Sequence, residues 1–276
     1  MKTASSRPGL TEQFLADRFQ EVITSADNSV PRVPIFQATY REVSCAQGIA
    51  DFVGVVRPTG RAESEAKAPL SLNCSLSAAS RVLGALVTAQ KPVAANALAA
   101  STGLSPRVVS HTLQYLMRSS LVRAPALGWY SFPSESAVPW PDMWAFEVKL
   151  SNWHRAVFQA LQYAAFASHV LVIMPQSKSK VAIANRDLFG RLGVGLLLFD
   201  PYTGHTRQVA PARRIGPASA AQAVYAAGRI LTLDAVTPAR ERRNTLNSVS
   251  SHAVCSEEVD DQNLDKAARD FAEKFC

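Results

Sequence analysis

The segment 144–175, WAFEVKLSNWHRAVFQALQYAAFASHVLVIMP, constrains the fold of the chain more than any other stretch. Residues 144–150 alternate apolar and polar side chains, which is typical of a strand. A polar Ser-Asn pair suits a helix N-cap, and we expect a helix over 153–167. One apolar stripe of this helix is formed by Val157, Leu161 and Ala164. The branched apolar run 169–175 favours a buried strand. Strand, helix and strand in this order predict an α/β core.

Two charged residues stand in the first of these strands. Glu147 and Lys149 are two positions apart, so their side chains point to one face, which should be buried. An ion pair, or a strand edge that reaches water, would account for them. A second explanation is a site where the carboxylate holds a metal and the ammonium group positions a water molecule. On the helix that follows, Gln159 and Tyr163 are spaced i, i+4 and share a face.

This combination resembles a known family. Glu147-Val-Lys149, followed by Gln159-x-x-x-Tyr163 and an apolar strand, is similar to the PD-(D/E)XK nuclease superfamily, in particular to its RecB-like branch. The resemblance implies a restriction-endonuclease-like αβββαβ core, a divalent metal (Mg²⁺ or Mn²⁺) and hydrolysis of phosphodiester bonds. It also implies an Asp on the strand before Glu-x-Lys, and often a Glu on the first helix.

Asp51 is the candidate for the implied Asp. It is the one acid in an otherwise apolar strand predicted at 48–56, where Ile49 and Val53 should share its face. A carboxylate there is costly unless it is paired, hydrogen-bonded or bound to metal. Ala50 stands where the family usually has Pro. The alternative is an Asp that caps a neighbour at a strand end.

Glu12 is the candidate for the acid on the first helix. We expect an amphipathic helix over 11–23, followed by strands at 34–43 and 48–56. The apolar arc of that helix contains Phe14, Leu15, Phe19, Val22 and Ile23. Glu12 lies at the margin of the arc, whereas Glu21 lies on the opposite side. The helix dipole, which favours an acid at a helix N-terminus, explains Glu12 equally well.

The resemblance implies a role for each of these residues. Asp51 and Glu147 would ligate the metal, and Lys149 would orient the attacking water. The rest of the implied catalytic set is Gln159, Tyr163 and Glu12.

Between the predicted strands at 48–56 and 144–150, the pattern changes to that of a second, inserted unit. Pro-containing loops at 57–75 and 133–142 bracket it. It contains predicted helices at 77–89, 92–101 and 107–119 and a hairpin of 121–124 with 129–132. Three helices and a hairpin resemble the winged helix-turn-helix of bacterial regulators. The predicted organisation is a nuclease-like core at 1–57 and 143–235, a winged helix at 76–132, and a basic linker with a C-terminal helix at 236–276.

Most of the net charge of +7 lies in this inserted unit. Residues 76–132 hold five bases and no acid, which leaves 24 bases against 22 acids elsewhere. In a winged helix, the third helix enters the major groove of DNA. The predicted DNA contacts are Arg107, Ser110, His111, Gln114 and Arg118 on that helix and Arg123 on the wing. A basic surface without a partner, or a winged helix that binds protein, remains the alternative.

In the remaining chain, we expect a loop and short helix at 177–191, strands at 195–199 and 206–210, and helices at 218–231 and 259–275. No apolar run reaches the roughly 20 residues of a membrane span, and no signal core begins the chain. The four cysteines form no metal or disulfide framework, which favours the cytoplasm.

These patterns lead to three hypotheses. The first is a Mg²⁺-dependent nuclease, of endonuclease type, that acts on double-stranded DNA. The second is a DNA-binding regulator whose nuclease-like domain serves for dimerisation or sensing, which leaves a homodimer open. The third is an interaction scaffold in phage defence or a mobile element.

Overall fold

The computed structural model describes residues 9–25, 30–45, 48–56, 77–133 and 141–236, with side chains up to residue 230. The helix expected at 259–275 and the basic linker from residue 236 onwards lie almost wholly outside these residues. By its contacts, the chain divides into residues 1–236 and residues 237–276, so all that follows concerns the first unit.

The described part of the chain is mixed α/β. Its helices are α1 (Glu12–Thr24), α2 (Ser77–Ala89), α3 (Ala95–Thr102), α4 (Pro106–Arg118), α5 (Trp153–Tyr163), the 3₁₀ turn η2 (Gln176–Lys178), α6 (Lys180–Ala184), α7 (Arg186–Leu192) and α8 (Ala220–Val236). Its strands are β1 (Ala38–Cys45), β2 (Gly48–Val56), β3 (Val93–Ala94), β4 (Arg123–Ala126), β5 (Trp129–Ser131), β6 (Asp142–Val148), β7 (His169–Pro175), β8 (Gly195–Phe199) and β9 (Thr206–Ala210). None of the described helices is both long and apolar enough to cross a membrane.

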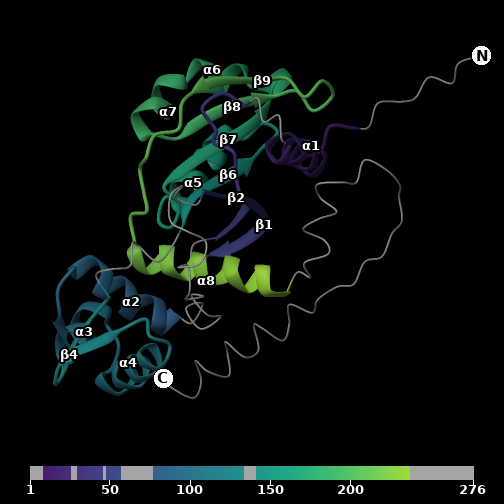
Figure 1. Ribbon diagram of the computed structural model, residues 1–276. Coiled ribbons are helices and arrows are strands. Elements are labelled where there is room, and N and C mark those ends of the chain that lie inside the picture. The colour runs from purple at the N-terminus through teal and green to yellow at the C-terminus, as the bar shows by residue number, and fades with distance from the viewer. Residues whose placement is uncertain (1–8, 26–29, 46–47, 57–76, 134–140, 237–276) are drawn as a thin grey trace, which may run out of the picture. The chain divides into compact units, whose positions relative to one another are not determined.

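Six strands form one sheet in the order β1-β2-β6-β7-β8-β9 (Figure 1). The pairs β1–β2, β2–β6 and β8–β9 are antiparallel, whereas β6–β7 and β7–β8 are parallel. If the inserted segment from α2 to β5 is left out, α1, β1, β2, β6, α5 and β7 follow one another along the chain in the order helix, three strands, helix, strand. The predicted strand at 34–43 begins only at Ala38, where pairing with Val55 of β2 starts.

Helices cover both faces of this sheet (Figure 1). On one face, α1 buries Leu15, Phe19 and Ile23 against Phe146 of β6 and Phe199 of β8. On the other face, α5 to α8 pack on the sheet in a second apolar cluster. Both faces of the central strands are therefore apolar, as the uninterrupted branched run of β7 predicts.

Helix α5 is shorter than expected. It ends at Tyr163 rather than near residue 167, and the chain then turns, with the N–H groups of Ala165 and Phe166 donating to the carbonyls of Gln162 and Tyr163. The N–H groups of Ala218 and Ser219 donate to the carbonyls of Ala164 and Ala165, at 2.9 and 3.0 Å. The apolar stripe that we predicted for this helix was also wrong at Leu161, which is 37% exposed. The buried face contains Trp153, Ala156, Val157, Ala160 and Tyr163.

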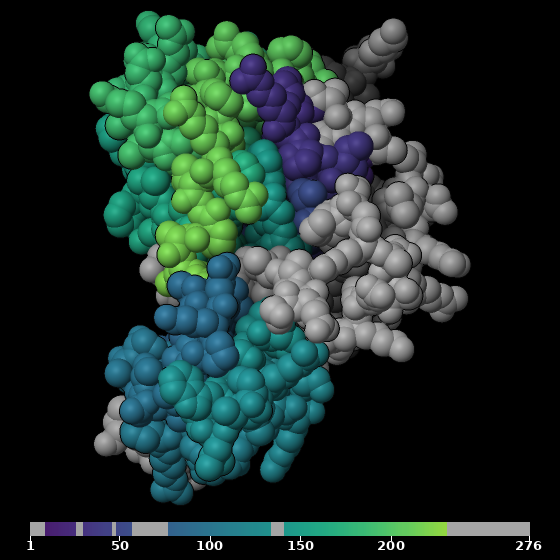
Figure 2. All heavy atoms as spheres, turned by 60° about the vertical axis from the view of Figure 1, so that its left-hand side comes forward, coloured from purple at the N-terminus to yellow at the C-terminus, as the bar shows by residue number. Residues whose placement is uncertain are grey.

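The inserted segment forms α2, α3 and α4 with a three-stranded sheet in the order β3-β5-β4. The helix expected at 92–101 begins only at Ala95, because Val93 and Ala94 pair with β5. Val224 and Ala227 of α8 complete the apolar cluster of this segment. Figure 2 shows α8, in yellow-green, against α2, in blue.

Candidate functional site

Strands β2 and β6 separate at the level of Asp51. Their pairing ends at Phe52 and Phe146, so the N–H of Val148 has no backbone partner on β2. The Asp51 carboxylate takes that place and accepts this N–H through Oδ2 at 2.7 Å. On the other side, Glu42 of β1 has φ 49° and does not pair with Asp51. Asp51 thus lies where two ladders are interrupted.

This interruption also breaks the alternation predicted for β2. Val53 is buried in the cluster beneath α5, but Ile49 is 57% exposed. Asp51 does not lie on the same face as Val53, because it borders a small cavity next to α1. The expected grouping of these three residues on one face was therefore wrong.

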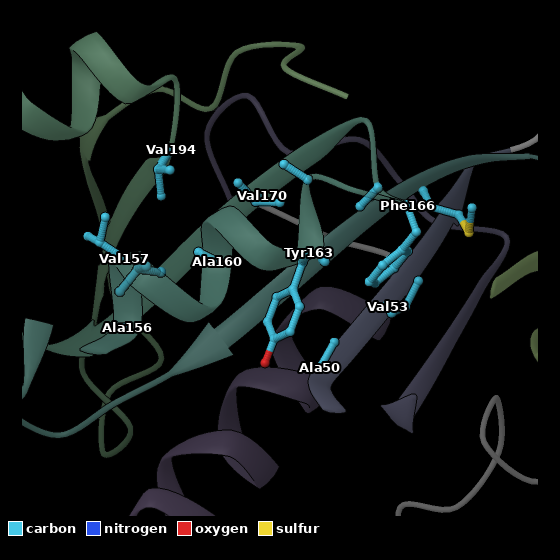
Figure 3. Packing of buried hydrophobic residues seen from close by; sticks show 14 of the residues in the cluster. Ala50, Val53, Ala156, Val157, Ala160, Tyr163, Phe166, Val170 and Val194 are labelled. Atoms are coloured by element: carbon cyan, nitrogen blue, oxygen red, sulfur yellow. The ribbon is translucent and has the colours of Figure 1, made fainter. Parts of the chain in front are cut away.

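Glu147 points to the α5 face of the sheet and is 1% exposed. Its Oε1 lies 2.6 Å from the Lys149 ammonium nitrogen, and its Oε2 lies 2.6 Å from the Tyr163 hydroxyl. That hydroxyl is also 2.6 Å from the carbonyl oxygen of Ile49. Figure 3 shows the Tyr163 hydroxyl leaving the apolar cluster towards the start of β2, near Ala50.

Lys149 connects this buried acid to α1. Its nitrogen is 3.7 Å from Oε2 of Glu12, and its side chain is 15% exposed. Oε1 of Glu12 accepts the N–H of Leu150 at 3.2 Å, which fixes the half-exposed carboxylate at the end of β6. The structure therefore brings Glu12, Asp51, Glu147, Lys149 and Tyr163 together.

Gln159 is not part of this network. It lies one turn before Tyr163 on α5, and its half-buried side chain bonds to neither acid. Its Oε1 is buried without a hydrogen-bond partner among the described residues.

A cavity of about 150 Å³ opens beside Asp51, between α1 and the start of β2. Glu12 and Val148 border it, as do Arg41 and Glu42, which the sequence patterns did not indicate. The Arg41 guanidinium pairs with Asp17 of α1 and lies over the Phe52 ring. Only the register of the β1–β2 hairpin, which sets Arg41 opposite Phe52, could have revealed this position.

Burial raises the pKa of both strand acids. For Asp51, the Val148 N–H and the Lys149 charge oppose the effect without cancelling it. For Glu147, the hydrogen bonds from Lys149 and Tyr163 oppose it. Burial lowers the pKa of Lys149, but the attraction of the surrounding acids is larger and leaves it above its ordinary value. Shifted titration of several groups in one place is typical of functional sites.

The oxygen donors at this site suit a hard cation such as Mg²⁺. No group of three His, Cys, Asp or Glu side chains in the described part of the chain is arranged as a metal cluster. A Mg²⁺ site needs fewer protein ligands than three, because this ion is commonly held by one or two carboxylates with waters. Asp51 Oδ2 bonds to Val148, whereas its Oδ1 bonds to no described residue. The carboxylates of Asp51 and Glu12 border the cavity, while Glu147 lies beside Lys149.

The predicted DNA contacts lie on one exposed face of α4. Arg107, Ser110, His111, Gln114 and Arg118 are all exposed, and so is Arg123 at the start of β4. The opposite face of α4 is buried through Val109, Leu113 and Leu116. Ser105 caps the helix by accepting the N–H of Val108, and Pro106 occupies its first position. The helix thus presents a polar, basic face without any acid.

Comparisons of the chain with protein-family models, with curated proteins and with solved structures found no match.

Proposed function

We propose that this protein is a Mg²⁺-dependent DNA nuclease of the PD-(D/E)XK type. The observation that carries the proposal is the convergence of two strand acids and a lysine where β2 leaves β6. These residues come from Asp51 and from the Glu147-Val-Lys149 motif. The order α1-β1-β2-β6-α5-β7 agrees with the αβββαβ core that the motif implies. Glu12 of α1 reaches the same point.

Each residue has a task in phosphodiester hydrolysis. When bound by Asp51 and Glu147, Mg²⁺ would supply Lewis-acid polarisation of the scissile phosphate. Lys149 positions the attacking water and stabilises negative charge that develops on the phosphate oxygens. Tyr163 holds the Glu147 carboxylate in place, and Glu12 pairs with the Lys149 ammonium group. The ion pair of Lys149 with Glu147 would compete with metal binding.

The α2–β5 segment would position the DNA. We interpret it as a winged helix because it has three helices, the short strand β3 and the hairpin β4–β5. Its exposed basic α4 face suits the phosphates and base edges of a duplex. A DNA-cutting role in the cytoplasm agrees with the absence of a disulfide pattern among the four cysteines.

Plasmid cleavage in Mg²⁺, with EDTA as the negative condition, tests this function. Asp51→Asn, Glu147→Gln and Lys149→Met should each lower the cleavage rate by at least about 100-fold. Glu21→Gln is the matched control, because Glu21 is an exposed acid of α1 that pairs with Arg18. This variant should cut like the wild type.

Binding measured in EDTA separates chemistry from recognition. The three variants should bind duplex DNA as tightly as the wild type, because α4 lies outside the substituted site. A wild-type protein that cuts neither plasmid, linear nor single-stranded DNA in Mg²⁺ or Mn²⁺ would contradict the proposal. The alternative of a non-cleaving DNA-binding regulator would then account for the basic segment.

A further inference from the structure

Besides the exposed face of α4, the protein has a second basic site, which lies between α7 and β9. It is separate from the cluster of Glu12, Asp51, Glu147, Lys149 and Tyr163, which we call the nuclease-like centre. It is an open hollow of about 530 Å³, which we call the arginine hollow. Its charged lining consists of Arg186, Asp187, Arg191 and Arg213, and its floor includes Val209 and Pro211. The volume falls within the roughly 300–1,000 Å³ that is usual for ligand sites.

The charges of the arginine hollow are not balanced within the described part of the chain. Arg191 and Arg213 make no ion pair with any described residue, and Arg186 has only a weak contact with Asp187, at 3.8 Å. Three other arginines have acid partners, namely Arg18 with Glu21, Arg41 with Asp17, and Arg214 with Asp142, whereas Arg155, Arg207 and Arg229 also make no ion pair with a described residue. Three guanidinium groups around one exposed acid leave a positive field that attracts anions.

The backbone is arranged to hold this cluster. Helix α7 ends at Gly193, which has φ 73° and whose carbonyl accepts the N–H of Arg213 at 2.9 Å. A Cβ on Gly193 would lie 2.3 Å from Cγ2 of Ile215. Glycine therefore allows the segment after β9 to lie against the end of α7. This contact brings Arg213 to the same hollow as Arg191.

The hollow lies on the same row of the sheet as the nuclease-like centre. The register joins Glu147 to Val172, Val172 to Leu196, and Leu196 to Ala210, which borders the hollow. Three strand spacings of about 4.8 Å make a separation of about 14 Å. That distance corresponds to about four base pairs along a DNA duplex. The hollow lies on the α7 side of the sheet, whereas the cavity beside Asp51 lies on the α1 side, so this separation is one along the sheet.

We propose that the arginine hollow binds phosphate groups. Guanidinium groups match the geometry of phosphate oxygens through paired N–H donors, and three of them converge here. The phosphates come from the DNA backbone that flanks the nuclease site or from a free phosphate compound. Only the first source rests on the proposed function, and neither requires cleavage.

The test uses the full chain in EDTA, so that nothing is cut. Binding of a fluorescein-labelled duplex is measured by anisotropy over a range of salt concentrations for the triple variant Arg186→Gln/Arg191→Gln/Arg213→Gln. The control removes the same charge at three exposed positions that do not border the hollow: Arg155→Gln/Lys178→Gln/Lys180→Gln. Circular dichroism and the Tm check that both variants fold. The hollow variant should lose two to three units of log–log salt slope, at about 0.9 per phosphate contact, whereas the control keeps the wild-type slope.

A second arm identifies the source of the phosphate. Pyrophosphate is titrated against each protein, and the Tm is followed. If DNA binding is unchanged in the hollow variant but pyrophosphate raises the Tm of the wild type and the control only, the hollow takes free phosphate compounds. If the hollow variant equals the control in both arms, the proposal is overturned. Cleavage by the wild type is a separate measurement, so failure of the nuclease function would be recognised independently.

Discussion

At Tyr163, one hydroxyl proton faces two acceptors. The carbonyl of Ile49 and Oε2 of Glu147 both lie 2.6 Å from the hydroxyl oxygen. A single O–H can donate to only one of them at a time. The contact nevertheless holds the start of β2, the acid of β6 and the end of α5 at one point. Tyr163 therefore stabilises the place where β2 and β6 separate.

Tyr163→Phe should destabilise the protein by about 1–3 kcal/mol, because it leaves buried acceptors without their donor. Cleavage should fall without being abolished, since Lys149 still holds Glu147. Tyr115→Phe is the matched control, because the Tyr115 hydroxyl is buried without a hydrogen-bond partner among the described residues. Its removal should be neutral or stabilising. Urea unfolding of both variants checks this, and equal losses of stability would contradict the role of Tyr163.

The buried carboxyl group of Asp51 should make the stability of the protein depend on pH. Burial raises its pKa in the folded protein above the ordinary value of 3.8, so the folded state binds the proton more tightly than the unfolded state. Stability from this group is therefore highest at low pH and falls as pH rises through the folded pKa. Asparagine keeps an acceptor for the Val148 N–H but carries no charge.

Asp51→Asn should therefore be more stable than the wild type at about pH 8, and the two should converge near about pH 4. Each kcal/mol gained raises the Tm by roughly 2–4 °C for a chain of this size. Thermal unfolding in EDTA across this range measures the difference. A variant that is less stable than the wild type at high pH would show that the ionised carboxylate is stabilising.

At the scale of the elements, α2 and α8 approach closely at a glycine. A Cβ on Gly84 of α2 would lie 2.5 Å from the backbone nitrogen of Ala221 on α8. Backbone atoms cannot rotate away as a side chain can. The two helices therefore depend on glycine at this position, although glycine is a poor helix former.

Gly84→Ala should destabilise the protein by about 1–3 kcal/mol, because overpacking outweighs the gain in helix propensity of up to about 1 kcal/mol. Gly190→Ala in α7 is the control, since a Cβ added to Gly190 would meet no described atom within 4 Å. This variant should be slightly more stable than the wild type. Chemical denaturation gives both values. Stabilisation by Gly84→Ala would mean that α2 and α8 can separate without cost.

Over the whole unit, α8 belongs to two apolar clusters. Ala223 and Ala226 pack against the six-stranded sheet, whereas Val224 and Ala227 pack against α2 to α4. The basic segment is thus inserted between β2 and β6 in the chain but shares a helix with the sheet. Separation of recognition from chemistry then depends on surface charges rather than on independent folding.

Arg107→Ala with Arg118→Ala should weaken duplex binding and lower the log–log salt slope by about 0.9 for each lost phosphate contact. Cleavage at saturating DNA should persist, because both residues lie on the exposed face of α4. Arg32→Ala with Arg155→Ala removes the same charge elsewhere and serves as the control. Anisotropy titrations in EDTA give the slopes. An unchanged slope in the α4 variant would exclude this helix as a DNA-binding element.

The sequence by itself determined the type and order of most elements, because these depend on local patterns. Alternation predicted β6, the apolar run predicted β7, and Ser105-Pro106 marked the start of α4. The same patterns placed Asp51 on one predicted strand and Glu147 and Lys149 on another. The distribution of charge along the chain likewise separated the basic segment from the remainder.

The tertiary structure alone decided how these elements meet. Local periodicity contains no information about where two strands part, so it put Asp51 on one face with Val53 rather than against the Val148 N–H. It could not foresee that the segment after α5 bonds to residues 218 and 219 through the carbonyls of Ala164 and Ala165. It also could not join α8 to two clusters or bring Arg213 to α7. Each of these features is a contact between residues far apart in the chain, which only the folded register creates.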